Sequence, residues 1–179
     1  MSADARRFEV LTFNSGGSGA RPEFDGLNAT AFPSGVSGVM TMPIEATEHA
    51  CPVIIWRKEL RLDSGGAGKT RGGLGQYMEV GAMEGYEFDI QAMFDRVDHP
   101  VRGWRGGMAG ARTTIARDDR SAMNGKGKQF GRRVVMAFPG GAGYGDPSER
   151  PKEHVLRDLA LDTSQRRLQP AHTAYLQKT

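Results

Sequence analysis

The sequence contains a single cysteine, Cys51, among 179 residues, so an internal disulfide bond is excluded. A lone thiol is typical of a protein from a reducing compartment. His49 lies two residues away and shares a face with Cys51 in an extended chain. Free cysteines are nevertheless among the most buried residues in proteins. We therefore predict a buried structural thiol.

Long apolar runs are also absent. No stretch approaches the ~20 apolar residues that cross a bilayer, and the first eight residues, Met-Ser-Ala-Asp-Ala-Arg-Arg-Phe, lack the apolar core of a signal peptide. The sequence thus favours a cytoplasmic protein that does not interact with a membrane.

The usual motifs of metal sites and of nucleophilic catalysis are missing. The four histidines are isolated from one another, with no His-x-x-x-His pair and no His-x-Asp cluster. There is no Gly-x-Ser-x-Gly elbow. We therefore expect no metal site in this chain and see no self-contained active site.

The charge is close to balanced, with a formal net charge of +3 and a pI near 9.2. Basic residues are spread along the chain with acidic neighbours, as in Arg57-Lys58-Glu59 and Arg117-Asp118-Asp119-Arg120. The densest basic segment, residues 126–133, contains one aromatic residue, Phe130. Nucleic-acid binding usually needs a denser basic face. A solvated strand edge is the preferred interpretation, and no nucleic-acid partner is expected.

Glycine is abundant, with 25 residues that occur in clusters. Such clusters are typical of tight turns with positive φ angles, and we prefer this interpretation to anion binding. One cluster, residues 63–75 (Asp-Ser-Gly-Gly-Ala-Gly-Lys-Thr-Arg-Gly-Gly-Leu-Gly), ends like a Walker A motif. However, Asp63 replaces the first glycine of that motif, and the glycines after Thr70 disfavour the required helix. We expect a connection between two strands and no bound nucleotide.

The remaining pattern alternates apolar segments with glycine-rich ones. Strands are predicted at residues 8–14, 52–62, 74–82, 88–94, 112–117 and 132–138, and one or two helical turns at residues 43–49. Asp146 and Pro147 form an N-cap signal before a helix that begins near Lys152. The order of elements predicts an α+β fold, mostly antiparallel β with glycine-rich connections and a C-terminal helix. We expect a single partial domain over residues 1–179, with a core at about 8–161 and a polar tail at 163–179.

Five segments carry a resemblance to a known family. They are residues 16–26 (Gly-Gly-Ser-Gly-Ala-Arg-Pro-Glu-Phe-Asp-Gly), 42–48 (Met-Pro-Ile-Glu-Ala-Thr-Glu), 63–75, 95–110 (Asp-Arg-Val-Asp-His-Pro-Val-Arg-Gly-Trp-Arg-Gly-Gly-Met-Ala-Gly) and 139–147 (Pro-Gly-Gly-Ala-Gly-Tyr-Gly-Asp-Pro). In their order and spacing these segments resemble the signatures of the hydantoinase B/oxoprolinase family. Three departures are minor: Ala142 stands for a usual glycine, Val101 for a common proline and Arg132 for a frequent acidic residue.

The resemblance implies the C-terminal portion of a hydantoinase B type subunit in a heteromeric enzyme. Such enzymes open a cyclic amide, a hydantoin or 5-oxoproline, with ATP bound by a hydantoinase A type subunit. The alternatives are a subunit fragment of an ATP-dependent ketone carboxylase of the acetone or acetophenone type, or a non-catalytic structural or assembly module. The implied partners are the A type subunit, the N-terminal portion of a B subunit and a small-molecule substrate.

The N-terminal portion of a B subunit, which carries the metal-binding residues where a divalent metal is used, has no counterpart here. The chain is therefore expected to be a split subunit, the product of a misassigned start, or a remnant, and to be inactive in isolation. We expect no cofactor bound by this chain itself.

Four charged residues in glycine- or proline-flanked segments are candidate site residues: Arg21, Asp25, Glu45 and Arg71. Charged side chains in such loops can meet a substrate or a neighbouring subunit. The planar guanidinium of Arg71 is suited to bind a carboxylate or a phosphorylated intermediate. The competing interpretation is that all four cap turns or form ion pairs at the surface.

Overall fold

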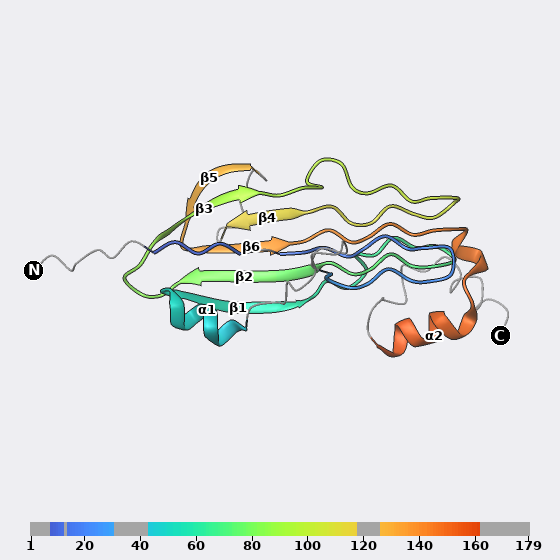
Figure 1. The fold of residues 1–179 in the computed structure, drawn as a ribbon, viewed down its shortest axis with the longest axis horizontal. Coiled ribbons are helices and arrows are strands. Elements are labelled where there is room, and N and C mark those ends of the chain that lie inside the picture. Colours follow the sequence, from blue (N-terminus) through green and yellow to red (C-terminus); the bar gives the residue numbers. More distant parts are fainter. Residues whose placement is uncertain (1–7, 13, 31–42, 118–125, 162–179) are drawn as a thin grey trace, which may run out of the picture.

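The structure, a computed structural model, describes residues 8–12, 14–30, 43–117 and 126–161 (Figure 1). Its elements are α1 (Ile44–Ala50), β1 (Val53–Leu60), β2 (Gln76–Ala82), β3 (Phe88–Met93), β4 (Thr114–Arg117), β5 (Lys126–Gly131), β6 (Arg133–Ala137), the 3-10 helix η1 (Pro147–Glu149) and α2 (Lys152–Ala160). All strand pairs are antiparallel. The predicted α+β class with a C-terminal helix is confirmed. None of the described helices has the length and apolar character of a membrane span.

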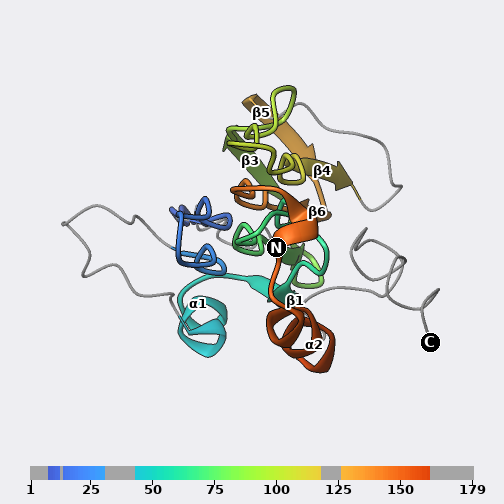
Figure 2. The ribbon, with the colours of Figure 1, turned by 90° about the vertical axis from the view of Figure 1, so that its right-hand side faces the viewer.

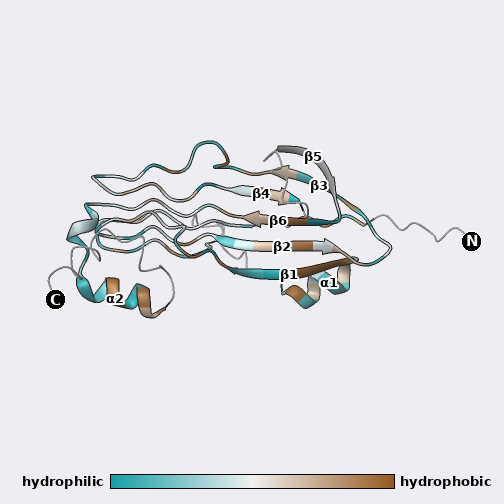
Figure 3. Ribbon diagram, turned by 180° about the vertical axis from the view of Figure 1, so that it is seen from behind, coloured by the Kyte–Doolittle hydropathy of each residue, from teal (hydrophilic) through white to brown (hydrophobic). Residues whose placement is uncertain are grey.

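The strands form two sheets at one end of an elongated molecule (Figure 1). A four-stranded sheet has the order β1-β2-β6-β4, and β3 pairs with β5 in a second sheet. β1 is apolar near α1 and hydrophilic at its far end (Figure 3), as the sequence predicts. Its pairing with β2 shifts between Ile55 and Arg57, so Trp56 lies in a bulge.

The hydrophobic core lies against one face of the four-stranded sheet. Alternate residues of β2 and β6 point inward because side chains alternate along a strand. Residues of β3, in the second sheet, and of α1 pack against these inward-pointing side chains. The buried members are Ile55, Met78, Ile115, Val134, Met136 and Phe138, with Ile44, Val80, Phe88, Ile90 and Phe94 packed around them.

The opposite face of this sheet carries aromatic rings covered by arginines. The Arg133 guanidinium lies 5.5 Å from the centre of the Trp56 ring, and that of Arg57 lies 4.6 Å from the Tyr77 ring. Arg133 also pairs with Glu79. The Trp56 side chain, which is exposed, lies over Gly81. No described element forms a second layer on this face (Figure 2).

The glycine-rich segments run side by side away from the sheet and form a bundle of extended chains (Figures 1 and 2). Residues 16–30, 64–75, 101–111 and 139–145 contribute to it, and their backbones hydrogen-bond directly to one another. The Gly73 N–H donates to the Ser18 carbonyl at 2.9 Å, and the Gly141 N–H donates to the Gly73 carbonyl at 2.8 Å. The Gly66 N–H donates to the Gly141 carbonyl at 2.8 Å. The bundle therefore satisfies buried backbone groups without a regular sheet.

The prediction that the glycine clusters form tight turns with positive φ angles is wrong for most of them. Among the glycines of the described residues, only Gly85, Gly106 and Gly145 have positive φ values. Most of the other described glycines allow close approach of neighbouring backbones. A Cβ on Gly72 would lie 2.0 Å from the Gly141 carbonyl oxygen, and one on Gly141 would lie 1.7 Å from that of Ser18. The crowded axis of the collagen triple helix selects glycine for the same reason.

Five predicted strands are confirmed with slightly shorter ends, and one is wrong. Residues 8–12 and 14 form no strand; in the described part of this segment, Phe8 packs edge-on against the Tyr86 ring, with centroids 6.3 Å apart. The chain then continues into the bundle, where Gly17 donates to the Pro139 carbonyl. Residues 126–133, predicted as a strand edge, comprise β5 and the first residue of β6. The predicted polar tail lies outside the described residues.

The turn at residues 43–49 and the C-terminal helix form as predicted. Pro43 precedes α1, the Asp146 carboxylate caps η1 by accepting from the Ser148 N–H, and α2 begins at Lys152. Cys51 is buried at the end of α1, where its thiol donates to the Thr47 carbonyl at 3.1 Å. The predicted structural thiol is therefore confirmed.

Candidate functional site

Two of the four candidate residues, Asp25 and Arg71, meet at the end of the bundle. The Asp25 carboxylate accepts a hydrogen bond from the Arg71 backbone N–H at 2.7 Å. It also accepts two hydrogen bonds from Arg150, from Nη1 to Oδ1 and from Nη2 to Oδ2, each 2.8 Å long. This two-point geometry is the strong form of an arginine–carboxylate pair.

Arg150 extends this pair into a buried network. Its Nη2 also donates to Oδ2 of Asp158 at 2.7 Å, and the Nε of Arg71 lies 3.5 Å from the same oxygen. Arg157 approaches Asp25 from the surface, with 3.6 Å between Nη2 and Oδ2. The side chains of Arg150 and Asp158 are only 5% and 3% exposed. Residues far apart in the sequence are thereby joined through ionic contacts.

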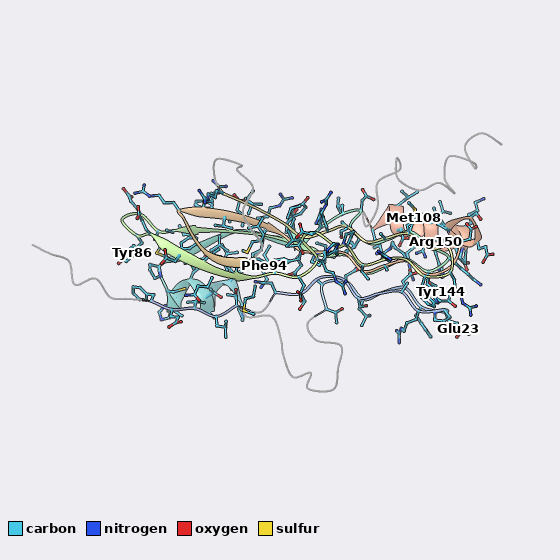
Figure 4. The ribbon with its side chains drawn as sticks, turned by 90° about the horizontal axis from the view of Figure 1, so that it is seen from above. Glu23, Tyr86, Phe94, Met108, Tyr144 and Arg150 are labelled. Carbon is cyan, nitrogen blue, oxygen red and sulfur yellow. The ribbon has the colours of Figure 1, made fainter. Side chains whose placement is uncertain are left out.

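The local sequence explains how α2 supplies its share of the network. Pro147 is the first residue of η1, and Pro151 directly precedes α2. Arg150 therefore lies in the short connection between the two helices. Asp158 and Val155 lie three residues apart on the buried face of α2. Figure 4 shows Arg150 at the same end of the molecule as Tyr144, Met108 and Glu23. The network therefore fastens α2 to the tips of the glycine-rich segments.

The electrostatics keep Asp25 ionised. Burial raises the pKa of its carboxyl group, but the hydrogen bonds from Arg150 and the Arg71 backbone, with the charges of both arginines, leave the pKa below the ordinary value. Burial likewise opposes the charge on Arg150, and its contacts with Asp25 and Asp158 outweigh that effect, so its pKa is raised. A carboxylate held this way is a poor general base, because its oxygens are occupied and its proton affinity is low.

The arginines are not fully satisfied. Within the described part of the chain, the buried Nε atoms of Arg71 and Arg150 have no hydrogen-bond partner. Nη1 of Arg71 donates to the Gly72 carbonyl at 2.7 Å, which directs its guanidinium into the bundle. Hydrogen bonds hold the Asp25 carboxylate and the Arg71 guanidinium at fixed positions. This favours a structural role for both residues. Whether either residue also contacts a substrate stays a prediction.

Arg21 and Glu45 do not join the network. Arg21 is exposed, with its guanidinium 5.1 Å from the centre of the Phe24 ring, while its carbonyl accepts from the Thr70 hydroxyl at 2.6 Å. Glu45 is exposed in the first turn of α1, at the sheet end of the molecule (Figure 1). The four candidate residues thus do not form one site, and the roles assigned to them remain predictions.

Sequence reasoning missed Arg150 and Asp158. One signal was available for Asp158: it lies at the spacing of the apolar stripe of α2, where an acidic residue needs a buried partner. Nothing comparable marks Arg150, whose partners are 125 and 8 residues away in sequence.

The geometry of residues 69–73 does not fit a phosphate-binding loop. The N–H groups of Lys69 and Thr70 donate to the Gly145 and Tyr144 carbonyls at 3.2 and 3.1 Å. Those of the next three residues donate to Asp25 Oδ1, to Gly66 and to Ser18. A phosphate cradle needs converging free N–H groups at a helix N-terminus, and the chain after Thr70 is extended. Within the described residues, no group of three or more His, Cys, Asp or Glu side chains is arranged to hold a metal ion.

Comparison with known proteins agrees with the resemblance in the sequence. The family model for hydantoinase B/oxoprolinase matches residues 1–147. The chain is 32% identical to the beta subunit of the caprolactamase of Pseudomonas jessenii, over 84% of its own length and 28% of that protein. It is 30% identical to the B subunit of a putative D-/L-hydantoinase of Pseudomonas sp. (strain NS671), covering 80% of this chain and 25% of that one.

Solved structures show the same fold. The crystal structure of the ATP-dependent caprolactamase from Pseudomonas jessenii matches with a TM-score of 0.72 and 26% identity, over 88% of this chain and 29% of that chain. A nucleotide-free acetone carboxylase matches in fold with a TM-score of 0.61 at 19% identity, over 86% of this chain and 25% of that one. The chain therefore spans between 25% and 29% of the length of these four proteins. It belongs to the hydantoinase B/oxoprolinase family.

Proposed function

We propose that this chain acts as the C-terminal part of a hydantoinase B type subunit in the ATP-dependent hydrolysis of a cyclic amide. The observation that carries the proposal is the match to a caprolactamase, in sequence to its beta subunit over 84% of this protein and in fold to the crystal structure with a TM-score of 0.72. Caprolactam is a cyclic amide, as are hydantoins and 5-oxoproline. The substrate class in this proposal is therefore a lactam-type ring.

The chemistry of such a ring explains the need for ATP. An amide carbonyl is a poor electrophile because the nitrogen lone pair is delocalised into it. In the proposed reaction, ATP transfers its γ-phosphoryl group to the ring amide oxygen and ADP leaves. Water adds to the activated carbon, and the ring C–N bond breaks as the nitrogen takes up a proton, which leaves an acyl phosphate. A second water hydrolyses the acyl phosphate to a carboxylate and inorganic phosphate. In this scheme ATP is held by an A type subunit, and any divalent metal is held by the N-terminal portion of the B subunit.

The contribution of this chain in the proposal is to build a rigid surface for its partners and its substrate. The backbone bundle and the ionic network between Asp25, Arg71, Arg150 and Asp158 fix the positions of the loop tips. Two side chains at that end, Arg21 and Lys69, are exposed and free to approach a neighbouring subunit. The face of the four-stranded sheet that carries Trp56 and Tyr77 with their arginines is a second surface on which a partner subunit can bind in this proposal.

The experiment that tests the proposal is co-purification of this chain with an A type subunit and the N-terminal portion of a B subunit from the same source. ATP hydrolysis by the assembled proteins is then measured with hydantoins, 5-oxoproline, lactams, and ketones plus bicarbonate. Stimulation by a cyclic amide is the expected result. Stimulation by a ketone with bicarbonate would replace the proposal with the carboxylase alternative. Assembly whose activity does not depend on this chain would favour a structural module.

A further inference from the structure

Residues 104–107 form a tight turn at the end of the bundle with an unusual central residue. The Gly107 N–H donates to the Trp104 carbonyl at 3.0 Å, which closes the turn. Arg105 and Gly106 have φ angles of 51° and 91°. Positive φ at both central positions is the pattern of a type I′ turn, which strongly prefers glycine, asparagine or aspartate. An arginine at the first position is therefore strained by its Cβ atom.

The surrounding structure holds this strained turn in place. The Trp104 N–H donates to the Gly143 carbonyl at 3.1 Å, and the Gly145 N–H donates to the Trp104 carbonyl at 3.0 Å. Trp104 also forms an isolated parallel bridge with Tyr144. Strained backbone persists where neighbouring contacts over-determine it, and it is concentrated at functional positions. Glycine would remove the strain at residue 105 without loss of a backbone hydrogen bond.

The turn exposes two side chains, those of Trp104 and Arg105, whose residue types often contribute strongly to protein–protein binding. Trp104 is 68% exposed and Arg105 is also exposed. Met108, on the same segment, is 51% exposed and lies at the bundle end (Figure 4). Tryptophan and arginine are enriched among the residues that dominate binding energy at protein interfaces, above all where their backbone is rigid.

The position of the turn favours a protein over a small molecule as its ligand. Sites for small molecules are concave, whereas these side chains project from a loop tip. A second cationic residue, Arg102, is exposed on the same segment. An apolar ring flanked by guanidinium groups is complementary to an apolar pocket bordered by carboxylates.

We propose that the turn at residues 104–107 is an interaction site that inserts Trp104 into an apolar pocket of the N-terminal portion of a B subunit, with Arg105 paired to a carboxylate at the pocket rim. That portion is the part of the relatives that this chain does not cover. This inference rests on the proposed function, because it requires that the chain works in complex with other subunits. The strain at Arg105 is retained because the guanidinium serves the contact.

The test compares three variants of the full chain in binding to the N-terminal portion of the B subunit, with binding to the A type subunit measured separately. Arg105→Gly relieves the strain and removes the guanidinium, and Trp104→Ala removes the ring. Arg96→Gly is the matched control, because Arg96 is also an exposed arginine with a positive φ angle, 63°. Both glycine variants are expected to raise the urea midpoint of unfolding. Only Arg105→Gly and Trp104→Ala are expected to weaken binding, by at least tenfold in Kd.

Affinities of Arg105→Gly and Trp104→Ala within twofold of the wild type would overturn the inference. A rise in KM for the cyclic amide without a change in subunit affinity would also overturn it, because the turn would then contact the substrate. These outcomes are distinct from failure of the proposed function. In that case the wild-type chain itself would not bind the subunits.

Discussion

The Asp25 carboxylate and the Arg150 guanidinium form a two-point ion pair across 125 residues of sequence, with both hydrogen bonds 2.8 Å long. The side chains are 14% and 5% exposed. One partner lies at the tip of the first glycine-rich segment, and the other lies between η1 and α2. Because Arg150 also donates to Asp158 in α2, this pair connects the bundle to the C-terminal helix.

Replacement of this carboxylate by an amide should destabilise the protein strongly. In Asp25→Asn the side chain keeps its shape, but Arg150 and Arg71 lose a compensating charge in a buried site. Breaking a buried pair by neutralising one partner costs about 3–5 kcal/mol of unfolding free energy. The measurement is urea denaturation, with Glu45→Gln as the control because Glu45 is an exposed carboxylate. Equal stability losses in the two variants would contradict a role for the network.

The same carboxylate should contribute to the pH dependence of stability. Its pKa is lower in the folded than in the unfolded protein, so the unfolded state binds more protons in the acidic range. The contribution is complete above the unfolded value of about 4 and is lost as the pH falls through the folded pKa. Urea midpoints at neutral and acidic pH should show a smaller acid loss in Asp25→Asn than in the wild type. An identical acid loss would exclude Asp25 as a source of the effect.

The thiol of Cys51 should react slowly in the native protein. Burial raises its pKa, which lowers the fraction of reactive thiolate at neutral pH, and the side chain is inaccessible to reagents. Reaction with a disulfide reagent is expected to be slower than in denaturing urea by roughly tenfold or more. A native rate equal to the unfolded rate would show that the α1 end opens readily.

The isolated chain should not bind ATP through residues 63–75. The N–H groups of residues 69–73 already donate to protein acceptors, so no cradle for phosphate is left in the loop. Calorimetric titration of the wild type and of Lys69→Ala should give no saturable heat in either protein. Stoichiometric binding that Lys69→Ala abolishes would refute this interpretation of the loop.

The sequence was sufficient to predict most of the sheet and both helix starts. β3 alternates apolar and polar residues, β1 begins with an apolar run, and Asp146-Pro147 carries a cap signal, so local chemistry determines these elements. The class of the fold followed from their order.

The bundle itself was not predictable from local signals. A glycine such as Gly73 is compatible with a turn and with extended chain alike. What decides between them is a neighbour 46 residues away, since a Cβ on Gly73 would lie 1.9 Å from the Leu27 carbonyl oxygen. The ionic network was hidden for the same reason, because Asp25, Arg71 and Arg150 meet only after the bundle has formed.

The bundle requires glycine at positions where backbones touch. Gly72 and Gly19 lie in the same bundle, but a Cβ on Gly72 would meet the Gly141 carbonyl oxygen at 2.0 Å, whereas one on Gly19 would meet nothing within 4 Å. Neither has a positive φ angle. The two positions therefore differ in the room available for a side chain, and neither has a backbone conformation that requires glycine.

The most direct measurement is the unfolding free energy of Gly72→Ala and Gly19→Ala from urea denaturation. Gly72→Ala should lose about 3 kcal/mol through overpacking of the bundle, and Gly19→Ala should change by less than about 1 kcal/mol. Equal stability of Gly72→Ala and Gly19→Ala would contradict the assignment of the glycine clusters to a close-packed backbone bundle.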